Sequence, residues 1–314
     1  MPVLKLRPAC KDYLWGGERL RTDFNIRSDL NPLAEAWVLS CHPDGPSVIE
    51  NGPFAGQTLA QYIAAHPESV GRLGAAFADF PVLIKLIDAK SDLSIQVHPS
   101  DEYALKHENQ FGKTEMWYIL DCAPDAYLYY GFEREIDSAE FAGRIRDNTL
   151  PEVLHRAPVR KGDLFFIPSG TLHAICKGIV LAEVQQNSNV TYRVYDYGRL
   201  GPDGQPRALH IEKALAVAET RPVDTGKFEF GGHMAQCRYF TVDVMRAPFT
   251  AAAGGDSFTA LLAVDGEGSI SCGGETVSLQ KGGCVFLPAG SGEYRAEGML
   301  SLLCTGAGNA GEQP

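Results

Sequence analysis

The 314-residue chain lacks any run of apolar residues long enough to cross a bilayer, and its opening MPVLKLRPACKDYLWGG lacks the apolar core of a signal peptide. It is also poor in positive charge, because 28 Lys and Arg stand against 39 Asp and Glu, for a net charge of -11. Such a charge disfavours nucleic acid and anionic membranes as partners. We therefore expect a cytoplasmic protein without these partners, although a few local cations could still hold a small phosphorylated substrate.

Closely spaced cysteines are missing as well. None of the eight cysteines forms a C-x-x-C pair, which argues against a zinc ribbon and against a disulfide scaffold. We interpret them as reduced thiols that fill apolar sites. They are Cys10, Cys41, Cys122, Cys176, Cys237, Cys272, Cys284 and Cys304.

Helical patterns are few, and short strand-like runs dominate the chain. Examples are PVLIKLIDA, LSIQVH, EMWYIL and DLFFIP, and further on FTALLAVDG and GCVFLP, all bounded by Gly, Pro, Asp or Asn. Three segments predict short helices, which begin near Thr58, Asp137 and Leu209. The sequence therefore predicts an all-β dominated fold with a few short helices.

One stretch of the sequence occurs twice. KGDLFFIPSGTLHAICKG, at residues 161–178, aligns without a gap with KGGCVFLPAGSGEYRAEG, at residues 281–298, which lies 120 positions further on. Each copy has the pattern of a strand that ends at a turn containing Pro and Gly. This pattern resembles the second signature of the cupins, which are double-sheet jelly rolls.

The distance between the two copies indicates a duplicated domain, because solenoid repeats are much shorter. We predict two cupin-type jelly-roll modules, at residues 1–222 and 223–314, that meet in the polar and Gly-rich segment ETRPVDTGKFEFGG. In the alignment of the two copies, His173 falls on Glu293. We therefore expect the second module to lack a metal site.

His173 needs partners if it is a metal ligand. Gln96 and His98 are two residues apart, so both face the same side of a strand, and Glu115 starts the next strand-like run. Two imidazoles, one carboxylate and a weaker amide ligand suit Zn²⁺, with manganese, iron or cobalt as alternatives, and leave a position for water or substrate. We interpret the other histidines as structural: His42, His66, His107, His155, His210 and His233.

Several motifs occur together in the first 200 residues. They are KDYLWGG, AEAWVLSCHP, LIKLIDAKSDLSIQVHPSDEYA, GKTEMWYIL, SGTLHAI and EVQQNSNVTYRVYDYGR, in this order. The combination resembles type I mannose-6-phosphate isomerase in its short bacterial form. The resemblance implies a cupin scaffold and a zinc-dependent exchange of mannose 6-phosphate and fructose 6-phosphate.

The resemblance also assigns roles to residues. By motif, the zinc ligands of the family fall on His98, Glu115 and His173, with Gln96 as a further ligand, and one Zn²⁺ per chain is implied. The catalytic arginine of the family falls on Arg193, in NVTYRVYD.

An aldose–ketose exchange through a cis-enediol needs a base near both carbons, a group that stabilises negative charge and an anchor for the phosphate. Arg193 could stabilise the negative charge that develops on the enediolate. Its structural alternative is an arginine stacked between tyrosines. For the base, Glu183 is an inward-facing candidate, and Lys85 lies within an apolar strand where burial could lower its pKa. Lys113, beside Glu115, could bind phosphate or relay a proton.

Each of these residues has a structural alternative. Lys85 could reach solvent from an edge strand, Glu183 could pair with an arginine, and Lys113 could lie on an exposed loop. Trp15, next to two glycines, is expected to wall the substrate pocket, and a buried core tryptophan is its alternative.

Two other functions are compatible with a metal cupin. One is an oxygenase that uses iron with the same ligands, and the other is a non-catalytic sugar-binding or regulatory cupin. The isomerase explains TYRVYD and the lysines better than an oxygenase acting on an apolar substrate does. We expect a monomer, because two packed modules can cover each other's apolar faces, and a weak homodimer is the alternative.

Overall fold

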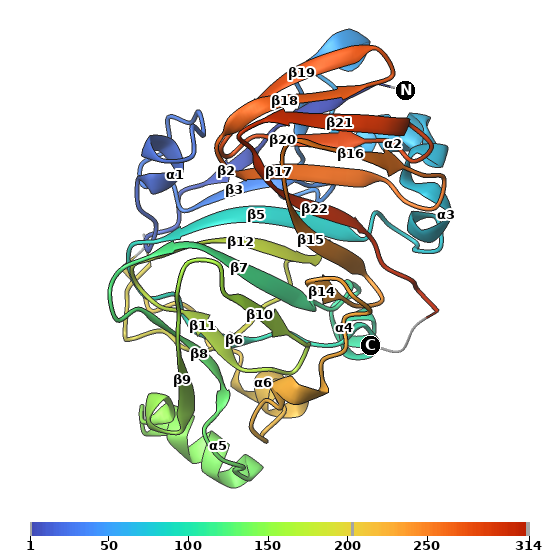
Figure 1. Cartoon of the computed structure of the whole chain (residues 1–314). Helices are drawn as coiled ribbons and strands as arrows, with labels where there is room; N and C mark the ends of the chain where they lie inside the picture. The colour runs from blue at the N-terminus through green and yellow to red at the C-terminus, as the bar shows by residue number, and fades with distance from the viewer. Residues whose placement is uncertain (1, 202–203, 312–314) are drawn as a thin grey trace. The chain divides into compact units, whose positions relative to one another are not determined.

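The computed structural model describes residues 2–201 and 204–311, and it divides into two compact units. The terminal unit, which carries both chain ends, consists of Met1–Asp88, Leu181–Asn187 and Glu229–Pro314. The central unit consists of Ala89–Val180 and Ser188–Phe228. Strands dominate both units and helices are short (Figure 1), as the sequence predicts.

Two antiparallel sheets face each other in the terminal unit. One has seven strands in the order β14-β15-β22-β17-β20-β1-β4, and the other has four in the order β16-β21-β18-β19. Apolar residues of both sheets, among them Leu261 and Ile270, form one buried cluster. This is the sheet-on-sheet packing of a jelly roll.

The strands of the first sheet are β14 (Ala235–Gln236), β15 (Phe240–Arg246), β22 (Ser301–Ala307), β17 (Thr259–Asp265), β20 (Cys284–Leu287), β1 (Leu4–Arg7) and β4 (Val48–Ile49). Those of the second are β16 (Phe249–Ala253), β21 (Gly292–Gly298), β18 (Glu267–Cys272) and β19 (Glu275–Gln280).

Strand β1 is the reason why the compact units differ from the predicted modules. It pairs with β20 on one side, where Leu4 opposes Phe286, and with β4 on the other, where Leu6 opposes Ile49. An N-terminal strand therefore completes the sheet made by the C-terminal strands. The division at 1–222 and 223–314 follows the sequence repeat, whereas the compact units follow this long-range pairing.

The terminal unit also holds β2 (Ala9–Lys11), β3 (Glu35–Leu39), β5 (Val82–Ala89) and most of β12 (Ile179–Gln186), which neighbour one another in the order β12-β5-β3-β2. Every residue of β3, β5 and β12 is buried. Four of these buried residues carry charge: Glu35, Lys85, Asp88 and Glu183.

The helices of the terminal unit are α1 (Arg19–Thr22), α2 (Leu59–Ala65) and α3 (Gly71–Gly74), with 3-10 turns η1 (Gly52–Phe54) and η2 (Pro67–Val70). Helix α2 begins after Thr58, as predicted. The Thr58 hydroxyl accepts a hydrogen bond from the Gln61 N–H, and the Gln61 side chain accepts one from the Thr58 N–H. This reciprocal pair is a capping box, which satisfies two backbone donors at the helix start.

The central unit is built on a five-stranded sheet in the order β13-β6-β11-β8-β9. Its strands are β13 (Tyr192–Tyr195), β6 (Ile95–Val97), β11 (His173–Ile175), β8 (Tyr127–Phe132) and β9 (Leu154–Pro158). Strand β7 (Glu115–Cys122) pairs with β10 (Leu164–Ile167). The helices are α4 (Asp101–His107), α5 (Ser138–Arg146) and α6 (Ile211–Val217), with 3-10 turns η3 (Leu150–Glu152) and η4 (Thr225–Lys227).

Helices α5 and α6 match the predicted segments, and Asp137 caps α5 by accepting the Glu140 N–H. Helix α4 was not predicted. Its local signals are a Ser100 cap and two acidic residues in the first turn, Asp101 and Glu102, which favour the positive end of a helix.

The repeated stretch has the same local structure in both copies. In the first, β10 ends at a turn in which the Thr171 N–H bonds to the Pro168 carbonyl, and β11 then begins at His173. In the second, β20 ends at a turn in which the Ser291 N–H bonds to the Pro288 carbonyl. The predicted strand–turn–strand shape is confirmed for both.

None of the helices in residues 2–201 and 204–311 has the length and apolar character needed to span a membrane.

Candidate metal centre and active site

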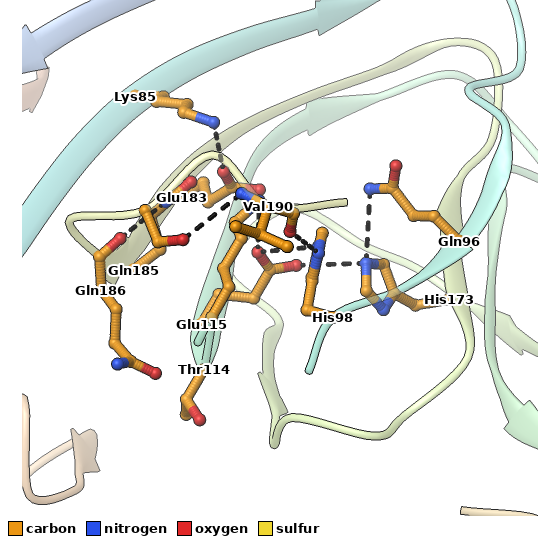
Figure 2. Close-up of polar contacts among 12 residues, drawn as sticks. Lys85, Gln96, His98, Thr114, Glu115, His173, Glu183, Gln185, Gln186 and Val190 are labelled. Atoms are coloured by element: carbon orange, nitrogen blue, oxygen red, sulfur yellow. Dashed lines mark hydrogen bonds and ion pairs between the residues drawn. The ribbon is translucent and has the colours of Figure 1, made fainter. Parts of the chain in front are cut away.

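Three of the predicted ligands meet inside the central unit. His98, Glu115 and His173 each offer a ligand atom, and these atoms lie within 4.8 Å of one another. Their exposed fractions are 1%, 0% and 0%. His98 directly follows β6, Glu115 opens β7 and His173 opens β11, so three strand ends converge on one point (Figure 2).

The two imidazoles are oriented by backbone carbonyls. Nδ1 of His98 lies 2.8 Å from the carbonyl oxygen of Val190, and Nδ1 of His173 lies 2.8 Å from that of Thr171. Because a carbonyl oxygen only accepts, each Nδ1 carries a proton and donates it. The Nε2 atoms then face Glu115, at 3.7 Å for His98 and 3.4 Å for His173.

A cation would fit between the two rings and the carboxylate. In neutral imidazoles protonated at Nδ1, the Nε2 lone pairs point at the negatively charged Glu115. A metal ion at that point would accept the lone pairs and offset the carboxylate charge. Metal-binding histidines typically donate the N–H of the ring nitrogen that does not bind the metal to a carbonyl oxygen. The group could therefore hold a metal ion.

Gln96 lies next to this group. Its Nε2 is 3.4 Å from Nε2 of His173 (Figure 2). Across the sheet, Gln96 of β6 opposes His173 of β11 on one side and Arg193 of β13 on the other. Directly opposed residues of antiparallel strands project to the same face. His173, Gln96 and Arg193 therefore form a row on one face of the sheet.

Lys113 is buried and also contacts the group. Its ammonium nitrogen lies 2.9 Å from Oε2 of Glu115, and its exposed fraction is 4%. Lys113 lies in the loop before β7, as its structural alternative proposed, but the expected exposure is wrong because its side chain is buried. A buried ammonium beside the carboxylate balances part of its charge and brings a proton donor to the edge of the candidate site.

Trp117 was not among the predicted site residues. It lies two residues after Glu115 on β7, and its fully buried ring packs edge-on against the His173 imidazole, with centroids 5.3 Å apart at 80°. The contact fixes the plane of the ring in addition to the bond at Nδ1. The pattern E-x-W on a strand is the signal that could have indicated it, since residues two apart share a face.

Arg193 is half-buried and held from several sides. Its Nε donates to the Ser94 hydroxyl at 3.2 Å, and a terminal nitrogen donates to the Ala208 carbonyl at 3.3 Å. Its backbone N–H donates to Nδ1 of His210 at 3.2 Å. Burial and the charge of Arg193 lower the pKa of His210, which leaves the ring neutral and able to accept. These partners differ from the stacking between tyrosines that formed the structural alternative.

The other two catalytic candidates pair with each other in the terminal unit. The ammonium of Lys85 lies 3.1 Å from a carboxylate oxygen of Glu183 and 3.9 Å from one of Glu35. It also stands over the Trp37 ring, 5.0 Å from the centroid, and the Trp37 indole N–H donates to Glu35 at 2.7 Å. The alternative for Lys85 is therefore wrong, because its side chain does not reach solvent. Glu183 forms an ion pair, as its structural alternative expected, and Lys85 is a partner in it.

The Lys85–Glu183 pair is expected to matter for stability. Both side chains are at most 5% exposed, and removing one member of a buried pair leaves an uncompensated charge. Lys85→Met should lower the free energy of unfolding by about 3–5 kcal/mol in urea denaturation, and adding Glu183→Met should restore part of this loss. Arg72→Gln, which breaks the exposed pair with Asp256 in the same unit, should cost less than about 1 kcal/mol. A Lys85→Met protein as stable as the wild type would contradict the prediction.

Trp15 is buried in the terminal unit and stacks on Tyr13, with centroids 5.6 Å apart. The glycines beside it permit a close approach of two segments. A Cβ atom at Gly17 would lie 2.2 Å from a carboxylate oxygen of Asp88, and that oxygen accepts the Arg19 N–H. The WGG motif thus has a packing function, and the role of Trp15 at a substrate pocket stays a prediction.

The second copy of the repeat carries no comparable group. Glu293 is 64% exposed in its side chain and pairs with Arg295 at 3.3 Å. Within the described residues, the central His98–Glu115–His173 group is the one cluster of its kind that could hold a metal ion. The two copies therefore share a local shape, and the absence of a metal from the second module stays a prediction.

Two family models match the sequence. The model for the catalytic domain of type I phosphomannose isomerase matches residues 3–127, and the model for the cupin domain of mannose-6-phosphate isomerase matches residues 231–305. A probable mannose-6-phosphate isomerase of Bacillus subtilis, GmuF, is 41% identical over 96% of this chain and 98% of its own length. The chain belongs to the mannose-6-phosphate isomerase family.

Other members of the family are similar to this chain over nearly their whole length. The mannose-6-phosphate isomerase ManA of Bacillus subtilis is 38% identical, with 96% of this chain and 97% of its own covered. The crystal structure of the mannose 6-phosphate isomerase from Bacillus subtilis superposes with a TM-score of 0.89 at 37% identity, covering 97% of this chain and 99% of the other. Membership of this enzyme family favours the isomerase over the oxygenase and over the non-catalytic cupin.

Proposed function

We propose that the protein is a zinc-dependent isomerase that interconverts mannose 6-phosphate and fructose 6-phosphate through a cis-enediol. The observation that carries the proposal is the buried His98–Glu115–His173 group, in which both Nε2 lone pairs face the carboxylate. Its occurrence in a chain of the mannose-6-phosphate isomerase family supports the substrate.

For the metal, we propose one Zn²⁺ held by His98, Glu115 and His173, because two imidazoles and a carboxylate form a donor set typical of zinc sites with an open position. Gln96 would add a weaker ligand if its amide turned to present its oxygen instead of its nitrogen. Bound zinc would supply a Lewis acid that polarises the carbonyl of the substrate.

The chain's own residues would stabilise charge and move the proton. Arg193, on the same sheet face as His173 and Gln96, presents a permanent positive charge to the oxygen that becomes negative as the enediol forms. The exchange takes a proton from C2 of the aldose and returns one to C1, while the hydroxyl proton at O2 passes to O1. We propose Lys113 as the group that relays a proton or binds the phosphate.

Glu183 and Lys85 are the further candidates for the proton-transfer base. Their mutual ion pair at 3.1 Å stabilises the charged forms, a protonated lysine and an ionised carboxylate, so Glu183 is the better base of the two. A folded protein that carries Lys85→Met and Glu183→Met tests this directly. Full turnover by this variant would show that neither residue is the proton-transfer base. Loss of turnover in a variant that still binds metal would support Glu183 as the base.

The proposed function is tested by the turnover of mannose 6-phosphate before and after chelation. Activity should disappear as the chelator removes about one metal ion per chain and return when Zn²⁺ is added, while manganese and cobalt restore it to different degrees. Activity that survives complete removal of metal would contradict the metal dependence. A protein with one bound zinc but no turnover of mannose 6-phosphate would contradict the substrate.

A further inference from the structure

The segment that follows β13 returns to hold Arg193. After Tyr195 the chain leaves the sheet, and it comes back at Ala208 and His210. Ala208 accepts a hydrogen bond from the Arg193 guanidinium at 3.3 Å. His210 accepts the Arg193 backbone N–H at 3.2 Å and donates its own N–H to the Arg193 carbonyl at 2.8 Å. The returning segment therefore fixes one end of the guanidinium, while Ser94 holds Nε from outside the segment.

One buried carboxylate ties the outgoing and returning parts of the segment together. Asp196, 7% exposed, receives Nε of Arg207 at 2.6 Å and a terminal nitrogen of the same residue on its other oxygen. Arg199 donates to it at 2.6 Å. Two parallel bonds between a guanidinium and a carboxylate fix orientation as well as distance. Burial raises the pKa of Asp196, but the bonds from Arg207 and Arg199 outweigh it and lower the pKa, so the carboxylate is ionised.

The position of this bidentate pair along the chain is what connects it with Arg193. Asp196 directly follows the last residue of β13, and Arg207 directly precedes Ala208. Between them, Leu200 and Pro206 form a bridge and the Gly201 N–H bonds to the Gln205 carbonyl, so the turn closes on itself. The Asp196–Arg207 pair therefore locks the base of the segment, next to the carbonyl that holds Arg193.

The charges around Arg193 also connect it with Asp196. The positive charges of Arg207 and Arg199 act against Arg193 and lower its pKa, after burial, whereas the negative charge of Asp196 raises it. Without Asp196, the repulsion that Arg207 and Arg199 exert on Arg193 would lose the negative charge that offsets it. Arg193 would then be held less firmly in its row with Gln96 and His173.

We propose that Asp196 is a positioning residue for Arg193, acting through Arg207 and the Ala208 carbonyl. This inference rests on the proposed function, since it assigns to Asp196 the task of aiming the arginine that stabilises the enediol. It also gives a role to the aspartate that ends the motif TYRVYD.

Asp196→Asn is the first test, because it keeps the shape and removes the charge. We expect kcat to fall about 10- to 100-fold, the size of effect that follows a small misplacement of a catalytic group, with KM less affected and the zinc content unchanged. Arg207→Lys, which keeps the charge but loses the bidentate fork, should give a smaller loss in the same parameter. The matched control is Arg221→Gln, which breaks the exposed pair with Glu219 in the same unit and should leave kcat unchanged.

The decisive experiment is a double-mutant cycle with Arg193→Ala. If Asp196 acts through Arg193, Asp196→Asn should cause no further loss of kcat once Arg193 is gone. An equal loss in both backgrounds would overturn the inference, as would an Asp196→Asn enzyme with wild-type kcat. If Asp196→Asn unfolds the protein, the same cycle is run with Arg207→Lys. If the proposed function itself is wrong, the wild-type protein will show no turnover of mannose 6-phosphate. This result differs from every outcome that bears on Asp196.

Discussion

His173→Ala is expected to abolish metal binding and to reduce turnover of mannose 6-phosphate by about 10³-fold or more. His173 supplies one of two imidazole nitrogens in a buried group with a single carboxylate, so its removal leaves too few ligands for tight binding. Polarisation of a carbonyl by a metal stabilises a transition state by several kcal/mol, and each 1.4 kcal/mol corresponds to about tenfold in rate.

The measurement combines metal analysis by mass spectrometry, turnover and a thermal unfolding curve on the same sample. The protein should remain folded, because the backbone of β11 keeps its pairing with β6 and β8. His233→Ala is the matched control, since this histidine is exposed and pairs with Asp243 in the terminal unit, and it should keep both metal and turnover. An active His173→Ala protein with one metal per chain would show that the ligand assignment is wrong.

Arg193→Ala is expected to keep the metal and lose about 10²- to 10³-fold in kcat, the usual effect of deleting one preorganised donor to a developing oxyanion. The loss should fall on kcat more than on KM, because the charge that Arg193 meets develops only as the enediol forms. Arg193→Lys should recover part of the rate, since it restores the charge without the planar fork.

The comparison with His173→Ala separates the two roles. One variant loses metal and turnover together, and the other loses turnover alone. If Arg193→Ala turned over at nearly the wild-type rate, the arginine would be structural, and Asp196 would then have no catalytic group to position.

The candidate ligands could be predicted because the residues next to each of them in the sequence indicate its position on a strand or turn. Gln96 and His98 share a strand face, Glu115 opens an apolar run, and His173 follows a Pro-Ser-Gly turn whose geometry Gly170 fixes with a positive φ of 90°. Such signals depend only on neighbouring residues and on the two-residue period of a strand.

The groups that orient these residues could not be predicted in the same way. The carbonyls of Val190 and Thr171 that hold the imidazoles, and the carbonyl of Ala208 that holds Arg193, are backbone atoms, and any residue type supplies them. The alternatives for Lys85 and Lys113 failed for a related reason. A lysine in a sequence is read as exposed, and only the fold reveals a carboxylate placed to receive it.

The place of β1 in the C-terminal sheet also has a consequence for how the chain acquires its structure during synthesis. Leu4 is made 282 residues (286 − 4) before its partner Phe286, which is roughly 15 to 60 s earlier at about 5–20 residues per second. The sheet cannot close before then, and the pairing of such distant segments is intrinsically slow. Until Phe286 emerges, the apolar side chains of β1 must remain exposed or be shielded by a chaperone. Completion of this sheet therefore has to wait until β20 has been synthesised.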